Sequence, residues 1–92
     1  GKVTHTVATG LHPTAMAWHE ASQRLYVANG NSDTVSVIDT RSQNVVGNIA
    51  LQPFTDKVRG IAPTALAIRP DGMTLYAACG GINAVAVIDT RT

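Results

Sequence analysis

Short apolar runs recur along the whole chain, separated by clusters of glycine, proline, asparagine, aspartate and serine. Within the runs, side chains alternate with a period of two, and β-branched residues are common, which predicts strands. The predicted strands cover residues 2–9, 14–18, 24–29, 34–39, 44–51, 64–68, 74–79 and 84–89. In the strand 14–18, bulky Met16 and Trp18 alternate with Ala15 and Ala17, so both faces are apolar and both are predicted to be buried. The pattern therefore predicts an all-β chain.

The predicted strands form an internal repeat. Residues 13–41 return as 63–91, and 14 of these 29 positions are identical. The strand 2–9 returns as 44–51, which begins 42 positions later (44 − 2), so the second copy carries eight additional residues (50 − 42) between its outer strand and the next strand. A period of about 42 residues with four short strands is typical of a β-propeller blade, which buries its faces against neighbouring blades.

The chain is therefore predicted to be a single propeller segment with strands for two blades. Strand 2–9 completes one blade, residues 14–51 form a full blade of four antiparallel strands, residues 52–63 form a long loop, and residues 64–89 form a partial blade of three strands.

The run Leu-Tyr-Val-Ala-Asn at residues 25–29, with residues 33–40 after it, resembles the YVTN β-propeller repeat family, which is named for a Tyr-Val-Thr-Asn run at this strand. Ala28 stands where the name has threonine, and residues 77–79 depart further, whereas the turn 70–72 and the ending 89–90 match. The resemblance implies a propeller fold and a bacterial periplasmic or cell-surface location. It also implies a role as a surface-layer, adhesion or ligand-binding module or as part of an enzyme, and such sequences are found joined to phosphoesterase domains.

A propeller ring needs about four to eight blades, more than one copy of this chain provides. We therefore expect the ring to be completed by other copies, with three or four copies favoured because larger rings twist their blades less. In such a homo-oligomer, strand 2–9 of each copy completes the partial blade of another. The alternative is that the chain is an excised segment of a larger protein.

Composition narrows the range of partners. Seven lysines and arginines against six aspartates and glutamates give a net charge of +1, with no run of one sign. Nucleic acids and anionic membrane surfaces require clustered positive charge, so neither is an expected partner. No apolar run reaches the length of a membrane span, so membrane insertion is not expected. The single cysteine excludes an internal disulfide.

Loops carry function more often than strands, and the functional face is predicted to carry the loops 10–13, 29–33, 52–63 and 79–83. The ligand-binding candidates are polar residues of the first three. The long loop contains Lys57 and Arg59, which together with His12 offer positive charge to a small anionic ligand or a protein. Asn29 and Asp33 complete the candidate set. The alternative is that the long loop is only a solvated insertion.

No catalytic residue, metal ligand set or cofactor is predicted. His5, His12 and His19 recur every seven residues, but this spacing does not gather them, and zinc needs three or four convergent ligands. Cys79 occupies the position of Asn29 and is interpreted as a small buried residue, because a cysteine nucleophile needs a nearby base. Without a carboxylate pair or a Ser/His/Asp set, we expect no hydrolase or redox activity.

Three functions remain open. The first is a non-catalytic repeat module that self-associates into a closed ring and serves as a scaffold or binding platform. The second is a segment of a larger ligand-binding propeller. The third is part of a lactonase-like or phosphoesterase-linked propeller enzyme, which needs acidic or histidine ligands from several blades. Fold alone does not decide among them.

Overall fold

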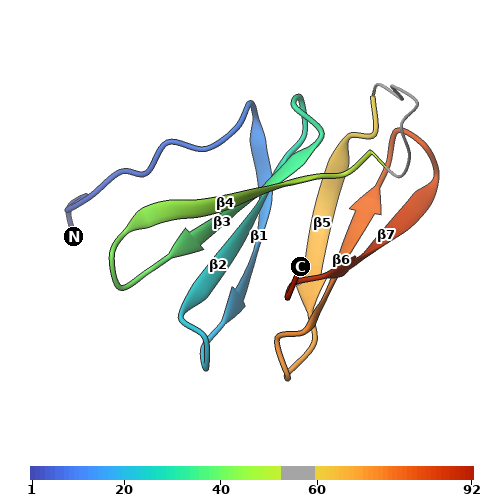
Figure 1. Ribbon diagram of the computed structural model, residues 1–92. Coiled ribbons are helices and arrows are strands. Elements are labelled where there is room, and N and C mark those ends of the chain that lie inside the picture. Colours follow the sequence, from blue (N-terminus) through green and yellow to red (C-terminus); the bar gives the residue numbers. More distant parts are fainter. Residues whose placement is uncertain (53–59) are drawn as a thin grey trace.

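The computed structural model describes residues 1–52 and 60–92. Seven strands in this part of the chain form two antiparallel sheets (Figure 1). The first sheet contains β1 (Pro13–His19), β2 (Arg24–Asn29), β3 (Thr34–Asp39) and β4 (Asn44–Ala50), and the second contains β5 (Pro63–Ile68), β6 (Thr74–Cys79) and β7 (Ala84–Asp89). In both sheets the strands lie in sequence order. All the regular elements of the described residues are strands, which confirms the all-β prediction. The described residues include no helix, so none of them forms an apolar helix that crosses a membrane.

The two sheets repeat each other in conformation as well as in sequence. A bulge between Pro13 and Ala15 in β1 returns between Pro63 and Ala65 in β5. Asp33 and its equivalent Asn83 both have positive φ angles, of 54° and 53°. Aspartate and asparagine tolerate this left-handed conformation better than other side chains that carry a Cβ atom, which explains their use in these turns.

Each sheet has two apolar faces, which we name by their residues. The tyrosine face of the first sheet consists of Ala15, Ala17, Tyr26, Val35 and Val37, and that of the second consists of Ala65, Ala67, Tyr76, Val85 and Val87. The leucine face of the first sheet consists of Met16, Trp18, Leu25, Val27 and Ile38, and that of the second consists of Leu66, Ile68, Leu75, Ala77 and Ile88.

The core forms where the tyrosine face of the first sheet packs on the leucine face of the second. Its buried members are Ala17, Tyr26, Val35, Val37, Leu51, Ile61, Leu75, Ala77 and Cys79. The small side chain of Ala17 in β1 lets the neighbouring strand β5 approach, and β1 and β5 lie beside each other in Figure 1. Full burial of a valine or leucine contributes about 1.5–3 kcal/mol, so this interface holds the two sheets together.

The equivalent residues on the tyrosine face of the second sheet are exposed. Val35 and Val37 are 0% and 6% exposed, whereas Val85 and Val87 are 62% and 69% exposed. On the first sheet's leucine face, Met16 also remains largely exposed. The same repeat thus buries one pair of faces and leaves the tyrosine face of the second sheet open. The leucine face of the first sheet is partly covered: Met16 and Trp18 are exposed, whereas Val27 and Ile38 are buried.

The N-terminal residues 2–9 form no strand, so the prediction of a strand there is wrong for the single chain. A strand requires a hydrogen-bonding neighbour, and no strand of the described residues pairs with this segment. The segment instead runs along the leucine face of the first sheet. There Thr4, His5, Val7 and Thr9 line a groove of about 690 Å³ with Met16, Leu25, Val27 and Ile38.

Candidate functional site

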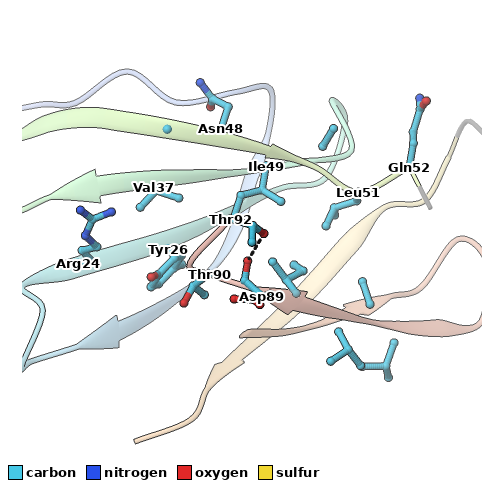
Figure 2. A pocket seen from close by; sticks show the side chains of 16 residues that line it. Arg24, Tyr26, Val37, Asn48, Ile49, Leu51, Gln52, Asp89, Thr90 and Thr92 are labelled. Atoms are coloured by element: carbon cyan, nitrogen blue, oxygen red, sulfur yellow. Dashed lines mark hydrogen bonds between the residues drawn. The ribbon is translucent and has the colours of Figure 1, made fainter. Parts of the chain in front are cut away.

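A cleft of about 700 Å³ opens between the outer parts of the two sheets (Figure 2). One wall comes from β2, β3 and β4 and carries Arg24, Tyr26 and Ile49, and the other comes from β7 and the residues after it. Among the described residues, β7 has no strand on its outer side, so its free backbone edge borders this cleft. An unpaired edge of this kind readily accepts another strand.

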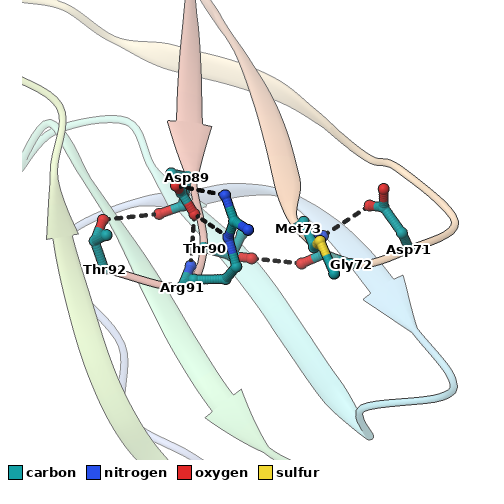
Figure 3. A network of polar contacts seen from close by, with 7 residues as sticks. All are labelled: Asp71, Gly72, Met73, Asp89, Thr90, Arg91 and Thr92. Carbon is teal, nitrogen blue, oxygen red and sulfur yellow. Dashed lines mark hydrogen bonds and ion pairs between the residues drawn. The ribbon is translucent and has the colours of Figure 1, made fainter.

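The floor of the cleft near β7 carries the acidic side chain of Asp89. Figure 3 shows that Arg91 encloses this carboxylate: its backbone N–H donates to it at 2.9 Å, and its guanidinium Nε and Nη2 donate at 3.1 Å. The side-chain hydrogen bond from Arg91 lowers the pKa of Asp89 below its ordinary value, and the same pairing raises the pKa of Arg91. Asp89 is therefore ionised near neutral pH and cannot act as a proton donor there.

Polar contacts at this end of the second sheet hold its two turns together. The hydroxyl of Thr90 donates to the carbonyl of Gly72, and the backbone N–H of Met73 donates to the carboxylate of Asp71 at 2.9 Å (Figure 3). These bonds fix the position of the β5–β6 turn relative to the end of β7. They satisfy backbone groups and leave no reactive pair of side chains.

The histidine and cysteine side chains lie in different parts of the described structure. None of them forms a group of three or more histidine, cysteine and acidic side chains that could hold a metal ion. Of the three histidines, His12 directly precedes β1 and His19 is its last residue, so these two lie at opposite ends of the strand. His5 lies in the N-terminal segment. Cys79 is buried in the core, as the sequence predicted, and its thiol donates to the Ala77 carbonyl at 3.5 Å.

The structure uses two of the predicted ligand-binding residues for its own support. Asn29 is fully buried, and its amide nitrogen donates to Ser36 Oγ at 2.9 Å, so it does not face a ligand. The carboxylate of Asp33 accepts the backbone N–H groups of Gly60 at 3.1 Å and Ala62 at 2.9 Å. Asp33 therefore ties the first sheet to the segment that enters β5.

The other predicted ligand-binding residues are not gathered into a site by the described part of the chain. His12 is exposed at the start of β1, and its carbonyl accepts the N–H of Gly30 at 2.9 Å. Lys57 and Arg59 lie outside the described residues, as do residues 53–59 of the predicted long loop. Within the loop's described part, Ile61 is fully buried in the core.

Two side chains that bridge the sheets were missed by the sequence reasoning. The hydroxyl of Thr14 donates to the Pro63 carbonyl at 2.9 Å, and Nε2 of His19 lies 2.8 Å from the Pro70 carbonyl. The carbonyl oxygen only accepts, so Nε2 carries the proton. The identity of residues 13–14 with 63–64 in the repeat was the one available signal for the first bridge.

Comparison with known proteins gives a likeness in structure. No family model matches this chain, and no curated protein does. A solved structure of hydrazine synthase from Kuenenia stuttgartiensis matches with a TM-score of 0.75 and 28% sequence identity, covering 99% of this chain and 24% of that chain. Nearly all of this chain is therefore similar in fold to a stretch of the hydrazine synthase chain, and it spans about a quarter of that chain's length.

Proposed function

We propose that this chain is a non-catalytic β-propeller repeat module, similar to the YVTN repeats, whose copies associate into a closed ring. The ring serves as a scaffold or binding platform. The observation that carries the proposal is the contrast between the two tyrosine faces. One is buried against a leucine face within the chain, and its equivalent, with Val85 and Val87 exposed, lies open.

The two open faces match each other by the repeat. The buried interface pairs a tyrosine face with a leucine face, and a single chain leaves the second tyrosine face open and the other leucine face exposed at Met16 and Trp18. Copies that stack head to tail repeat the same contact, with the second sheet of one copy on the first sheet of the next. An exposed apolar surface of this kind is typical of an interaction site.

The N-terminal segment completes the partial blade in this arrangement. In the repeat, residues 2–9 are equivalent to β4, which begins at Asn44, and β7 is equivalent to β3. The observed pairing of β4 with β3 therefore predicts that residues 2–9 of one copy pair with β7 of another. The transferred register places Val7 opposite Val85 and Lys2 opposite Asp89. The last pair has opposite charges, which favours cross-strand pairing.

The observed course of the segment supports this role. His5, Val7 and Thr9 line the groove on the first sheet's leucine face, and their equivalents Gly47, Ile49 and Leu51 line the cleft beside the second sheet. Residues 2–9 thus lie against the first sheet much as β4 lies against the second. The segment is already on the side from which another copy approaches.

A head-to-tail interface gives a ring when its rotation closes and a filament when it does not. Propeller rings contain about four to eight blades, which permits two to four copies of two blades each. We favour three or four copies. For a small anionic ligand or a protein, we propose His12, Lys57 and Arg59 as the binding residues of the platform; Lys57 and Arg59 lie outside the described residues. Alanine at Lys57 and Arg59 is expected to weaken the binding of inorganic phosphate, and unchanged binding contradicts that assignment.

The test of association is sedimentation equilibrium at micromolar concentration. We expect a folded species of three or four times the chain mass of 9.6 kDa. A folded species of one-chain mass overturns the proposal.

A second candidate is a segment of a longer propeller protein, in which further blades come from the same polypeptide. The match to a stretch that makes up 24% of a hydrazine synthase chain favours it. In that case the open faces are covered by neighbouring repeats, and the isolated chain aggregates or unfolds rather than forming a defined ring.

A further inference from the structure

Polar side chains connect the two sheets across the buried interface within the chain, and they indicate which residues meet between copies. Resting on the proposed function, we infer that the interface between copies repeats these contacts, and that a charge pair between Arg69 of one copy and Glu20 of the next selects the head-to-tail arrangement. The partner is therefore a second copy of this chain, and the pair determines how that copy is oriented.

The first contact that repeats is the hydroxyl bridge between neighbouring inner strands. Within the chain, Thr14 Oγ donates to the Pro63 carbonyl at 2.9 Å. A shift by one repeat turns this pair into Thr64 of one copy and Pro13 of the next, with both residue types unchanged. Thr64 is exposed, and its hydroxyl lies 3.4 Å from the carbonyl of Ala78, the same distance that separates Thr14 from its own cross-strand carbonyl. Its side chain is thus already oriented for the contact.

The second contact changes its chemistry when it is shifted. Within the chain, His19 at the end of β1 reaches across to the Pro70 carbonyl in the β5–β6 turn. The equivalent of His19 is Arg69, and the equivalent of Pro70 is Glu20. An imidazole N–H facing a backbone carbonyl inside the chain thus becomes a guanidinium facing the acidic residue of the β1–β2 turn in the next copy.

The β1–β2 and β5–β6 turns differ in conformation. The repeat therefore predicts that Arg69 lies near Glu20 of the next copy, but it does not predict which atom accepts the hydrogen bond. In the β1–β2 turn the N–H of Gln23 donates to the Glu20 carbonyl, whereas in the β5–β6 turn the N–H of Gly72 donates to the Arg69 carbonyl. The long side chains of Arg69 and Glu20 accommodate this difference. Among the described residues of its own chain, Arg69 forms one ion pair, a 4.0 Å approach of its Nε to Asp71 with both side chains about half exposed, and such exposed pairs hold an arginine weakly.

The charge pair opposes the wrong arrangement of copies. If two tyrosine faces packed on each other with their strands parallel, the two Arg69 side chains would lie at the same end of the interface, and juxtaposed like charges are costly there. With the strands antiparallel, the two Arg69 side chains would lie at opposite ends and gain no pairing with each other. A head-to-tail interface brings Arg69 beside Glu20 at every contact. Because each copy contributes one of each residue to opposite interfaces, the pair favours a closed ring over a two-fold dimer.

The test uses two charge reversals that are complementary to each other. Arg69→Glu alone leaves two acidic groups at each interface, and Glu20→Arg alone leaves two arginines. We expect each variant to associate about tenfold or more weakly than the unchanged chain at low salt. An equimolar mixture is expected to recover association, because every alternating contact then joins opposite charges. Alternation also requires an even number of copies, so the mixture is expected to shift toward four.

The control is Arg41→Glu, which makes the same charge change in the β3–β4 turn and is expected to associate like the unchanged chain. Circular dichroism of each variant shows that it is folded. If the unchanged chain assembles and the single reversals assemble equally well, the charge pair is refuted while the proposed ring stands. If the reversals weaken assembly but their mixture does not recover it, the pairing of these two residues is also refuted. If the unchanged chain is a folded monomer, the proposed function itself fails.

Discussion

One valine in each repeat distinguishes the buried interface from the open one. Val35 lies in the core between the sheets and is 0% exposed, whereas its equivalent Val85 is 62% exposed. Replacing either with alanine removes the same two methyl groups from the same position of a blade. The two variants therefore differ only in what covers that position.

For Val35→Ala the cost follows from burial. Each buried methyl group contributes about 0.8 kcal/mol, and the cavity left behind adds to the sum of the two, so we expect a loss of about 2–3 kcal/mol in the free energy of unfolding. For Val85→Ala in a single chain we expect a change within about 0.5 kcal/mol, as for other surface substitutions. In an assembled ring, Val85 is buried like Val35, and the loss of about 2 kcal/mol weakens association by about 25-fold.

Urea unfolding followed by circular dichroism measures the first effect, and sedimentation equilibrium measures the second. The single tryptophan, Trp18, is 46% exposed on the open leucine face, so its fluorescence emission is expected to shift to the blue as copies associate. If Val85→Ala leaves association and this shift unchanged, the second sheet's tyrosine face is not the interface. If Val35→Ala costs no more than an ordinary surface substitution, the two sheets do not pack as described.

Two further predictions concern single residues. Gly72 has a φ of 74°, and a Cβ atom there would lie 2.5 Å from the imidazole at the end of β1. At Gly60, with a φ of 73°, no atom of the described residues lies within 4 Å of such a Cβ atom. Gly60→Ala is therefore expected to cost about 1–2 kcal/mol for backbone strain alone, and Gly72→Ala clearly more, in urea unfolding; equal losses would contradict the contact across the sheets. Because Arg91 lowers the pKa of Asp89, the stabilisation by this pair is present above the ordinary pKa of an aspartate and is lost as the pH falls through the lowered value. Carboxyl titration by NMR is expected to show Arg91→Ala raising that pKa toward its ordinary range, and an unchanged pKa would refute the pairing.

The second and third strands of each sheet were predictable from local pattern. The bounds predicted for residues 24–29, 34–39, 74–79 and 84–89 are those observed, because alternating apolar residues end at strong turn signals. Residues 2–9 have a similar alternation but form no strand in the single chain. The reason is that a strand depends on its neighbour, and the pattern does not say whether that neighbour is in the same chain.

The candidate site was less predictable. Asn29 was predicted both to end the strand 24–29 and to bind a ligand from the loop that follows; it does end β2, and its amide donates to Ser36 inside the sheet. Asp33 was correctly placed in a turn, but its carboxylate binds backbone groups 27 and 29 residues away. Contacts such as His19 with Pro70 depend on how one blade stacks on the next. Local hydrophobic patterns carry no such information, although the repeat does show which residues are equivalent.

The central claim is that the open tyrosine face and the exposed part of the first sheet's leucine face are covered by further copies of this chain. Sedimentation equilibrium of the unchanged chain, over micromolar to submillimolar concentrations, tests it most directly. We predict a folded species of three or four times 9.6 kDa, with no folded monomer at the upper concentrations. A folded species that stays at 9.6 kDa throughout this range would contradict the claim.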